Sequence, residues 1–183
     1  GWGEVRRGDQ SKDAEMRATL GSTVQRDSQL EGCVFDETQD LIFIGEEAFG
    51  SWSYANRNAD AEPQIVDSIA ASNGLVADVE GVSVYYAPNG GYIVASAQEA
   101  DRFVVYDRLP PHSPRGIFTI TASADGSVDA VSHTDGLDVV SSALPGYPQG
   151  LLVVQDDGNP DSGVDQNFKL VDWALIKDAL GLD

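Results

Sequence analysis

Short apolar runs alternate with turn residues through most of the chain. Val, Ile, Tyr and Phe dominate these runs, and Gly, Asp, Asn and Pro separate them. The clearest runs are Leu41–Ile44, Val82–Tyr86, Tyr92–Ala95, Phe103–Tyr106, Ile117–Ile120 and Leu151–Val154. Apolar runs of this length, bounded by turn residues, predict an all-β protein. Only at Trp173–Leu182 do apolar residues recur at helical spacing, which predicts a short C-terminal helix.

Three segments open in the same way, with an acidic residue followed by glycine. The pairs are Glu31-Gly32, Glu80-Gly81 and Asp135-Gly136, at intervals of about 50 residues. Each pair precedes a strand, a turn, a second strand with a polar end and a third, aromatic strand. Repeats of this length with several strands each are typical of the blades of a β-propeller. We therefore predict about three four-stranded blades, which make half a ring.

The repeats also suggest boundaries along the chain. We assign residues 31–77, 78–128 and 129–183 to successive blades of one partial propeller domain. Residues 1–30 are polar and contain two further candidate strands. They fit either the outer strands of a preceding blade or a strand that closes the ring, and both interpretations stay open.

Acidic residues that recur at equivalent positions of the blades are expected to meet near the propeller axis. This predicts a cluster of Glu31, Glu80 and Asp135. The polar ends of the second strands predict a second tier, made of Glu47, Gln98 and Asp156. The alternative is that these residues are ordinary turn residues on a solvated acidic face.

The net charge of the chain limits the classes of molecule that the protein can bind. The 183 residues include 30 Asp and Glu against 11 Lys and Arg, a formal net charge of -19. This charge argues against binding to nucleic acid or to anionic membranes, and no apolar run is long enough to span a bilayer. Clustered carboxylates must hold protons or bind cations. Their oxygen atoms suit Ca²⁺, whereas one cysteine and two histidines offer little to zinc.

Seven motifs in series resemble those of the β-propeller phytases. They are Gln29–Val34, Ile44–Glu47, Asp78–Val82, Ala95–Gln98, Val105–Arg108, Ser132–Val139 and Gln166–Val171. Their order and spacing agree from Glu31 to Gly181, within the C-terminal half of that family. The resemblance implies a six-bladed propeller that hydrolyses phytate with several Ca²⁺ ions, and a secreted or periplasmic protein.

The resemblance also implies roles for individual residues. It places the ligands around the attacked phosphate at four acids, which are Asp78, Glu80, Asp129 and Asp135. Glu31 and Glu47 complete the metal cage, Gln98 is a further metal-binding residue, and Asp156 and Asn159 lie near a structural calcium. Oxygen atoms are the donors throughout, in agreement with the cluster expected from the repeats.

Two departures from the family pattern are local: His133 stands where Asp is usual, and Ala97 where Ser is usual. The phosphate-binding Lys and Arg residues that the family has in its N-terminal half have no counterpart here. Half a ring also exposes two blade faces, so we expect a partner, either the N-terminal half or a second copy. The alternatives are a catalytically silent calcium-binding module and a calcium-dependent propeller lactonase.

Overall fold

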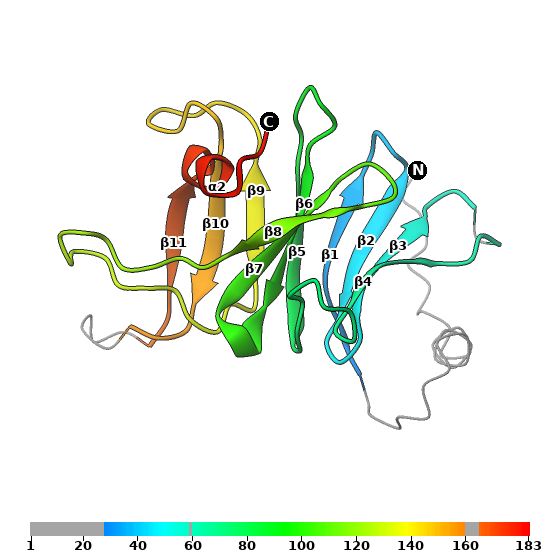
Figure 1. Ribbon diagram of the computed structural model, residues 1–183, viewed down its shortest axis with the longest axis horizontal. Helices are drawn as coiled ribbons and strands as arrows, with labels where there is room; N and C mark the ends of the chain where they lie inside the picture. Colours follow the sequence, from blue (N-terminus) through cyan, green and yellow to red (C-terminus); the bar gives the residue numbers. More distant parts are fainter. Residues whose placement is uncertain (1–27, 59, 160–164) are drawn as a thin grey trace, which may run out of the picture.

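The computed structural model describes residues 28–58, 60–159 and 165–183. Three antiparallel sheets stand side by side, and a short helix packs beside the last of them (Figure 1). This confirms the predicted all-β class and the C-terminal helix. No helix within the described ranges is long and apolar enough to cross a membrane.

Each sheet is built from consecutive strands. The first sheet contains β1 (Leu30–Asp36), β2 (Leu41–Glu46), β3 (Gly50–Ala55) and β4 (Gln64–Ser68). The second contains β5 (Val79–Tyr85), β6 (Tyr92–Ala97), β7 (Arg102–Asp107) and β8 (Pro114–Phe118), with the 3-10 turn η1 (Gln98–Ala100) after β6. The third contains β9 (Leu137–Val140), β10 (Leu151–Asp156) and β11 (Asn167–Asp172), and helix α2 (Trp173–Leu180) follows it.

The third sheet differs from the four-stranded blade that the repeats predict. Among the described residues it has three strands, because the chain turns into α2 directly after β11. Asp172 begins this helix, and its carboxylate accepts a hydrogen bond from the Ala174 amide at 3.0 Å. A side chain that caps the first turn favours the helix over further strand. The predicted segment 1–30 lies outside the described residues except for its last three positions.

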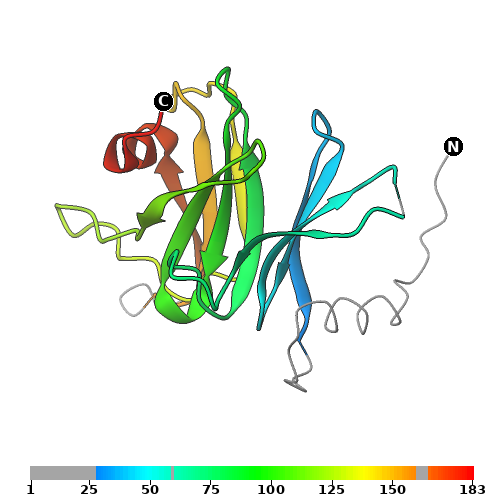
Figure 2. The ribbon, with the colours of Figure 1, turned by 45° about the vertical axis from the view of Figure 1, so that its right-hand side comes forward.

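The second sheet is apolar on both faces because it lies between the other two (Figure 2). Every residue of β5 and β6 is buried. Phe43 belongs to the core shared with the first sheet, and Leu152 to the core shared with the third sheet. Trp173 of α2 completes the second core by stacking on Tyr85, with ring centroids 4.0 Å apart.

The repeated glycines let the first strands of neighbouring sheets approach closely. A Cβ atom at Gly32 of β1 would clash with the carbonyl oxygen of Glu80 on β5. A Cβ atom at Gly81 would lie 2.8 Å from the backbone nitrogen of Leu137 on β9. The third glycine of the series, Gly136, has no described atom within 4 Å of its Cβ position. The acid-glycine pairs are therefore more than turn residues, since two of the glycines make room for the next sheet.

A buried hydrogen bond ties the second sheet to the first. The Tyr106 hydroxyl on β7 donates to Asp67 Oδ2 on β4 at 2.7 Å, and both side chains are buried. The other carboxylate oxygen of Asp67 accepts from the Ser68 amide and from Asn73. Burial, followed by the bond to Asp67, raises the Tyr106 pKa, so the phenol stays protonated and remains a donor.

We expect Tyr106→Phe to lower the free energy of unfolding by roughly 1–3 kcal/mol, because it leaves a buried carboxylate oxygen without its donor. Urea denaturation followed by tryptophan fluorescence measures the change. Tyr147→Phe, in the loop between β9 and β10, is the matched control and is expected to be near neutral. Equal losses in both variants would contradict the assignment of the effect to Asp67.

Candidate metal and active site

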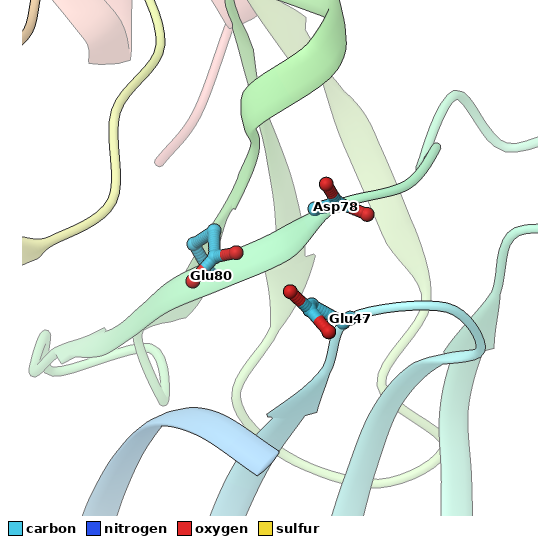
Figure 3. Close-up of side chains that lie close together, drawn as sticks. All are labelled: Glu47, Asp78 and Glu80. Atoms are coloured by element: carbon cyan, nitrogen blue, oxygen red, sulfur yellow. The ribbon is translucent and has the colours of Figure 1, made fainter. Parts of the chain in front are cut away.

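Three carboxylates meet where the first and second sheets adjoin (Figure 3). Glu47 follows β2, Asp78 directly precedes β5, and Glu80 is the second residue of β5. One oxygen atom from each lies within 4.8 Å of the other two. Glu80 is buried, and Glu47 and Asp78 are partly buried. Side chains from two sheets therefore converge on one point.

Backbone hydrogen bonds hold these three positions together. The Val79 amide donates to the Glu47 carbonyl oxygen at 3.2 Å, which joins the end of β2 to the start of β5. The Gln98 amide donates to the Asp78 carbonyl oxygen at 2.9 Å. The site is thus built on strand ends and on η1, where backbone bonds restrict the positions of the side chains.

Two more acids surround Glu80, and we call the five residues Glu31, Glu47, Asp78, Glu80 and Asp135 the acid cluster. Burial raises the Glu80 pKa to about 7, and the negative charges of the other four add to the effect. Burial, and then the charges of Glu47 and Glu99, also raise the Asp78 pKa. The structure thus brings together the acids that the three repeats predict.

Asp135 is held at the edge of this cluster by two glutamines. Its carboxylate accepts a hydrogen bond from Gln98 Nε2, and its amide donates to Gln155 Oε1 at 2.8 Å. Two residues earlier, the His133 amide donates a hydrogen bond to Asp101 Oδ1 at 2.7 Å. These bonds connect the loop before β9 to the turn after β6. Gln98, expected as a metal ligand, therefore lies beside an acid of the cluster.

The predicted second tier is only partly correct. Gln155, rather than Asp156, reaches Asp135, because neighbouring residues on a strand point to opposite faces. Asp156 instead forms a 2.6 Å ion pair with Lys169 on the other face of the third sheet. Lys169 also pairs with Asp129 at 2.8 Å, and this hydrogen bond lowers the Asp129 pKa.

Asp129, Asp156 and Asn159 thus form a second group around Lys169, apart from the acids that shift the Glu80 pKa. The resemblance had placed Asp129 with Asp78, Glu80 and Asp135. Sequence reasoning also missed Gln155 and Lys169. Strand alternation identifies Gln155 once the direction of one neighbour is known, but no sequence pattern identifies the partner of Lys169.

The acid cluster has the donors that a hard divalent cation requires. Its side chains offer only carboxylate oxygens, and Gln98 adds an amide oxygen nearby. Within the described ranges, no Lys or Arg forms an ion pair with any of the five acids. Burial, and then repulsion from the other four acids, raises the pKa of Glu80, and a bound cation would relieve this repulsion.

This shift predicts a pH dependence of stability. In the metal-free protein Glu80 has a folded-state pKa near 7 against 4.5 for an unperturbed glutamate. The loss of folding stability that this raised pKa causes is absent below pH 4.5, grows as pH rises toward 7 and is complete above 7. In chelator, we expect Glu80→Gln to melt several degrees above the unmodified protein at pH 8, and the two melting temperatures to converge near pH 4.5.

The same proton competes with a metal ion. We expect the affinity for Ca²⁺ to rise as pH increases through about 7, where Glu80 loses its proton. Calorimetric titration with Ca²⁺ at several pH values measures this, with Glu80→Gln as the control that lacks the titrating group. If the melting temperatures of Glu80→Gln and the unmodified protein instead differ by the same amount at every pH, the assignment of the pH dependence to Glu80 is contradicted.

Similarity to known proteins identifies the family of this chain. The sequence matches the family described as Phytase over residues 17–183. It is 41% identical over 160 residues to a 3-phytase of Bacillus subtilis (strain 168), an alignment that covers 84% of this chain and 41% of that protein. The chain therefore spans about two fifths of the length of this curated relative. The family match and this identity together confirm the resemblance: the chain belongs to the phytase family.

Proposed function

We propose that the chain forms part of a calcium-dependent phosphomonoesterase that hydrolyses phytate. The observation that carries the proposal is the meeting of Glu47, Asp78 and Glu80 oxygens within 4.8 Å. Membership of the phytase family and the similarity to a 3-phytase support the same substrate class. Calcium is the ion that fits best, because it accepts many oxygen ligands in irregular geometry.

The chemistry follows from charge. A protein of net charge -19 repels a polyphosphate, so its acids must be neutralised before the substrate can bind. Bound Ca²⁺ would supply this positive charge and lower the pKa of a coordinated water. Glu47, Asp78 and Glu80 would hold the ion, with Glu31 beside them, and the two glutamines would keep Asp135 facing the same space. The in-line attack of water on phosphorus would then proceed in a site with fixed charges.

We further propose that the three sheets are blades of a six-bladed propeller. Close approach at Gly32 and Gly81 brings the first strands of adjacent sheets together, as expected for strands that line an axis. At the last of the three sheets, a Cβ atom at Gly136 would have no described heavy atom within 4 Å, and Phe168 and Leu170 are 71% and 57% exposed. Apolar faces of this kind need a cover, and we propose the remaining blades of a phytase chain or a second copy.

A site of this kind works where calcium is abundant. Extracellular calcium modules bind their ions with dissociation constants of about 10⁻⁴–10⁻³ M, far above cytosolic calcium concentrations. We therefore propose that the protein acts outside the cytoplasm, as a secreted or periplasmic enzyme.

Phosphate release from phytate, measured with added Ca²⁺ and with chelator, tests the proposed activity. We expect release in Ca²⁺ that stops in chelator and returns when Ca²⁺ is restored. Release unaffected by chelator would contradict a metal-dependent site. If the 183-residue chain binds Ca²⁺ but releases no phosphate, even when combined with the N-terminal half of a related phytase, the silent-module alternative holds.

A further inference from the structure

The Lys169 ammonium lies at the centre of four side-chain oxygens on one face of the third sheet. Its Nζ atom is 2.8 Å from Asp129 Oδ1 and 2.6 Å from Asp156 Oδ2. It also donates to Asn167 Oδ1 at 2.7 Å and to Asn159 Oδ1 at 3.0 Å. We call these four residues the lysine cage.

The cage is largely interior, with Asp129, whose side chain is 31% exposed, at its open side. The Asp156 side chain is 0% exposed and that of Lys169 is 8% exposed. A buried carboxylate is tolerated only when a positive charge and hydrogen bonds compensate for its lost hydration. Here the Lys169 ammonium supplies the positive charge, and Asn159 and Asn167 accept the other hydrogen bonds of the ammonium.

The resemblance to phytases had predicted a structural calcium beside Asp156 and Asn159. The same oxygen atoms already serve the ammonium, and a divalent ion at this point would stand within a few ångströms of a positive charge. Calcium also requires six to eight oxygen ligands, so it would need these four in addition to others. The described residues therefore fit calcium poorly while Lys169 occupies the cage.

We propose that the Lys169 ammonium is the resident cation of this cage, in place of a structural calcium ion. It neutralises Asp156, whose other oxygen accepts a hydrogen bond from the Ser132 amide at 2.9 Å. The Ser132 carbonyl oxygen in turn accepts from the Asp157 amide at 3.1 Å. Lys169 thereby anchors the loop that leads to Asp135, and acts as a positioning residue for the acid cluster.

A cage emptied of its ammonium should then accept a metal ion. Two carboxylates and two amide oxygens would remain, and Asp129, Asn159 and Asn167 also line an open hollow of about 870 Å³ through which an ion can enter. The proposal thus predicts that removal of the lysine creates a calcium dependence that the unmodified cage lacks.

The test uses the full chain with Asp78→Asn and Glu80→Gln, which remove the calcium site proposed at the acid cluster. In this background we expect Ca²⁺ to change the melting temperature by less than about 1 °C. Adding Lys169→Met should lower the melting temperature in chelator by roughly 10 °C, and millimolar Ca²⁺ should restore at least half of the loss. Neither measurement uses phosphate release, so the outcome is independent of the proposed enzyme activity.

Calorimetric titration with Ca²⁺ keeps the test decisive even if Lys169→Met does not fold. The proposal is overturned if the background protein with Lys169 intact binds an ion that Asp129→Asn abolishes. It is also overturned if Lys169→Met melts at the unmodified temperature, or if its melting temperature fails to respond to Ca²⁺. Absence of an ion in the intact cage, with a calcium response only after Lys169→Met, supports it.

Discussion

In the proposed calcium-dependent phytase, Asp78→Asn is expected to lower kcat/KM for phytate by roughly 100- to 1000-fold and to weaken Ca²⁺ binding at least about tenfold. Asp78 contributes an oxygen to the group that lies within 4.8 Å, and its backbone is fixed by the bond from Gln98. An amide keeps the shape but removes the charge that neutralises the ion. The loss should therefore appear in metal affinity and in turnover together.

Stability separates this effect from misfolding. Because repulsion from Glu47 and Glu99 contributes to the raised Asp78 pKa, the neutral variant should be at least as stable as the parent in chelator. Calorimetric titration, phosphate release and thermal melting together measure the three quantities. Asp40→Asn is the matched control, since it removes the same charge at the β1–β2 turn, the opposite end of the first sheet from Glu47.

The control should leave calcium binding and turnover within about twofold of the parent. Asp40 also has a φ of 55°, a conformation that asparagine tolerates. A similar loss in both variants would mean that overall charge, and not the site, governs activity. Calcium affinity unchanged by Asp78→Asn would remove Asp78 from the metal site.

Arg108→Met is expected to lower the free energy of unfolding by about 3–5 kcal/mol. The Arg108 side chain is 8% exposed and that of Asp36 is 0% exposed, and Nη1 lies 2.6 Å from Asp36 Oδ2. Nη1 also lies 2.6 Å from Thr38 Oγ1, while Nε donates to the Gly90 carbonyl oxygen. The guanidinium joins the β1–β2 turn to the second sheet, and methionine would leave the Asp36 carboxylate buried without its counter-charge.

A double-mutant cycle identifies the cause. When Asp36→Ala accompanies Arg108→Met, the unpaired charge is gone, so the double variant should lose less than the sum of the two single losses. Urea denaturation provides all four free energies. Arg115→Met is the control, because the Arg115–Asp107 pair is partly exposed and is expected to contribute less than about 1 kcal/mol. Additive losses at Asp36 and Arg108 would contradict the proposed coupling.

The candidate site shows where prediction from sequence succeeds. Glu31, Glu80 and Asp135 occupy the same position in three successive repeats, and such positions lie side by side in stacked sheets. The glycine after each acid has a steric reason that becomes visible only in the structure, since Gly32 and Gly81 face the backbone of the next sheet. The repeat pattern was therefore sufficient to predict that the acids lie together, although it did not explain why a glycine follows each acid.

Prediction failed where a side chain depends on a partner distant in sequence. The polar residues that end β10 are consecutive, so nothing local decides that Gln155 points to Asp135 and Asp156 to Lys169. Among the described residues, the third sheet also lacks the expected fourth strand, because the Asp172 cap favours a helix and the Trp173 and Ile176 side chains of that helix pack in the core.

The amino-acid sequence by itself determined the all-β class, the C-terminal helix, the family and the convergence of the acids. These properties follow from alternation, helical spacing and repetition, which are local or periodic features of the chain. Only the tertiary structure decided which acids face one another and which two pair with the Lys169 ammonium. The reason is that strand register and sheet packing set the direction of each side chain, and both arise from contacts between distant parts of the chain.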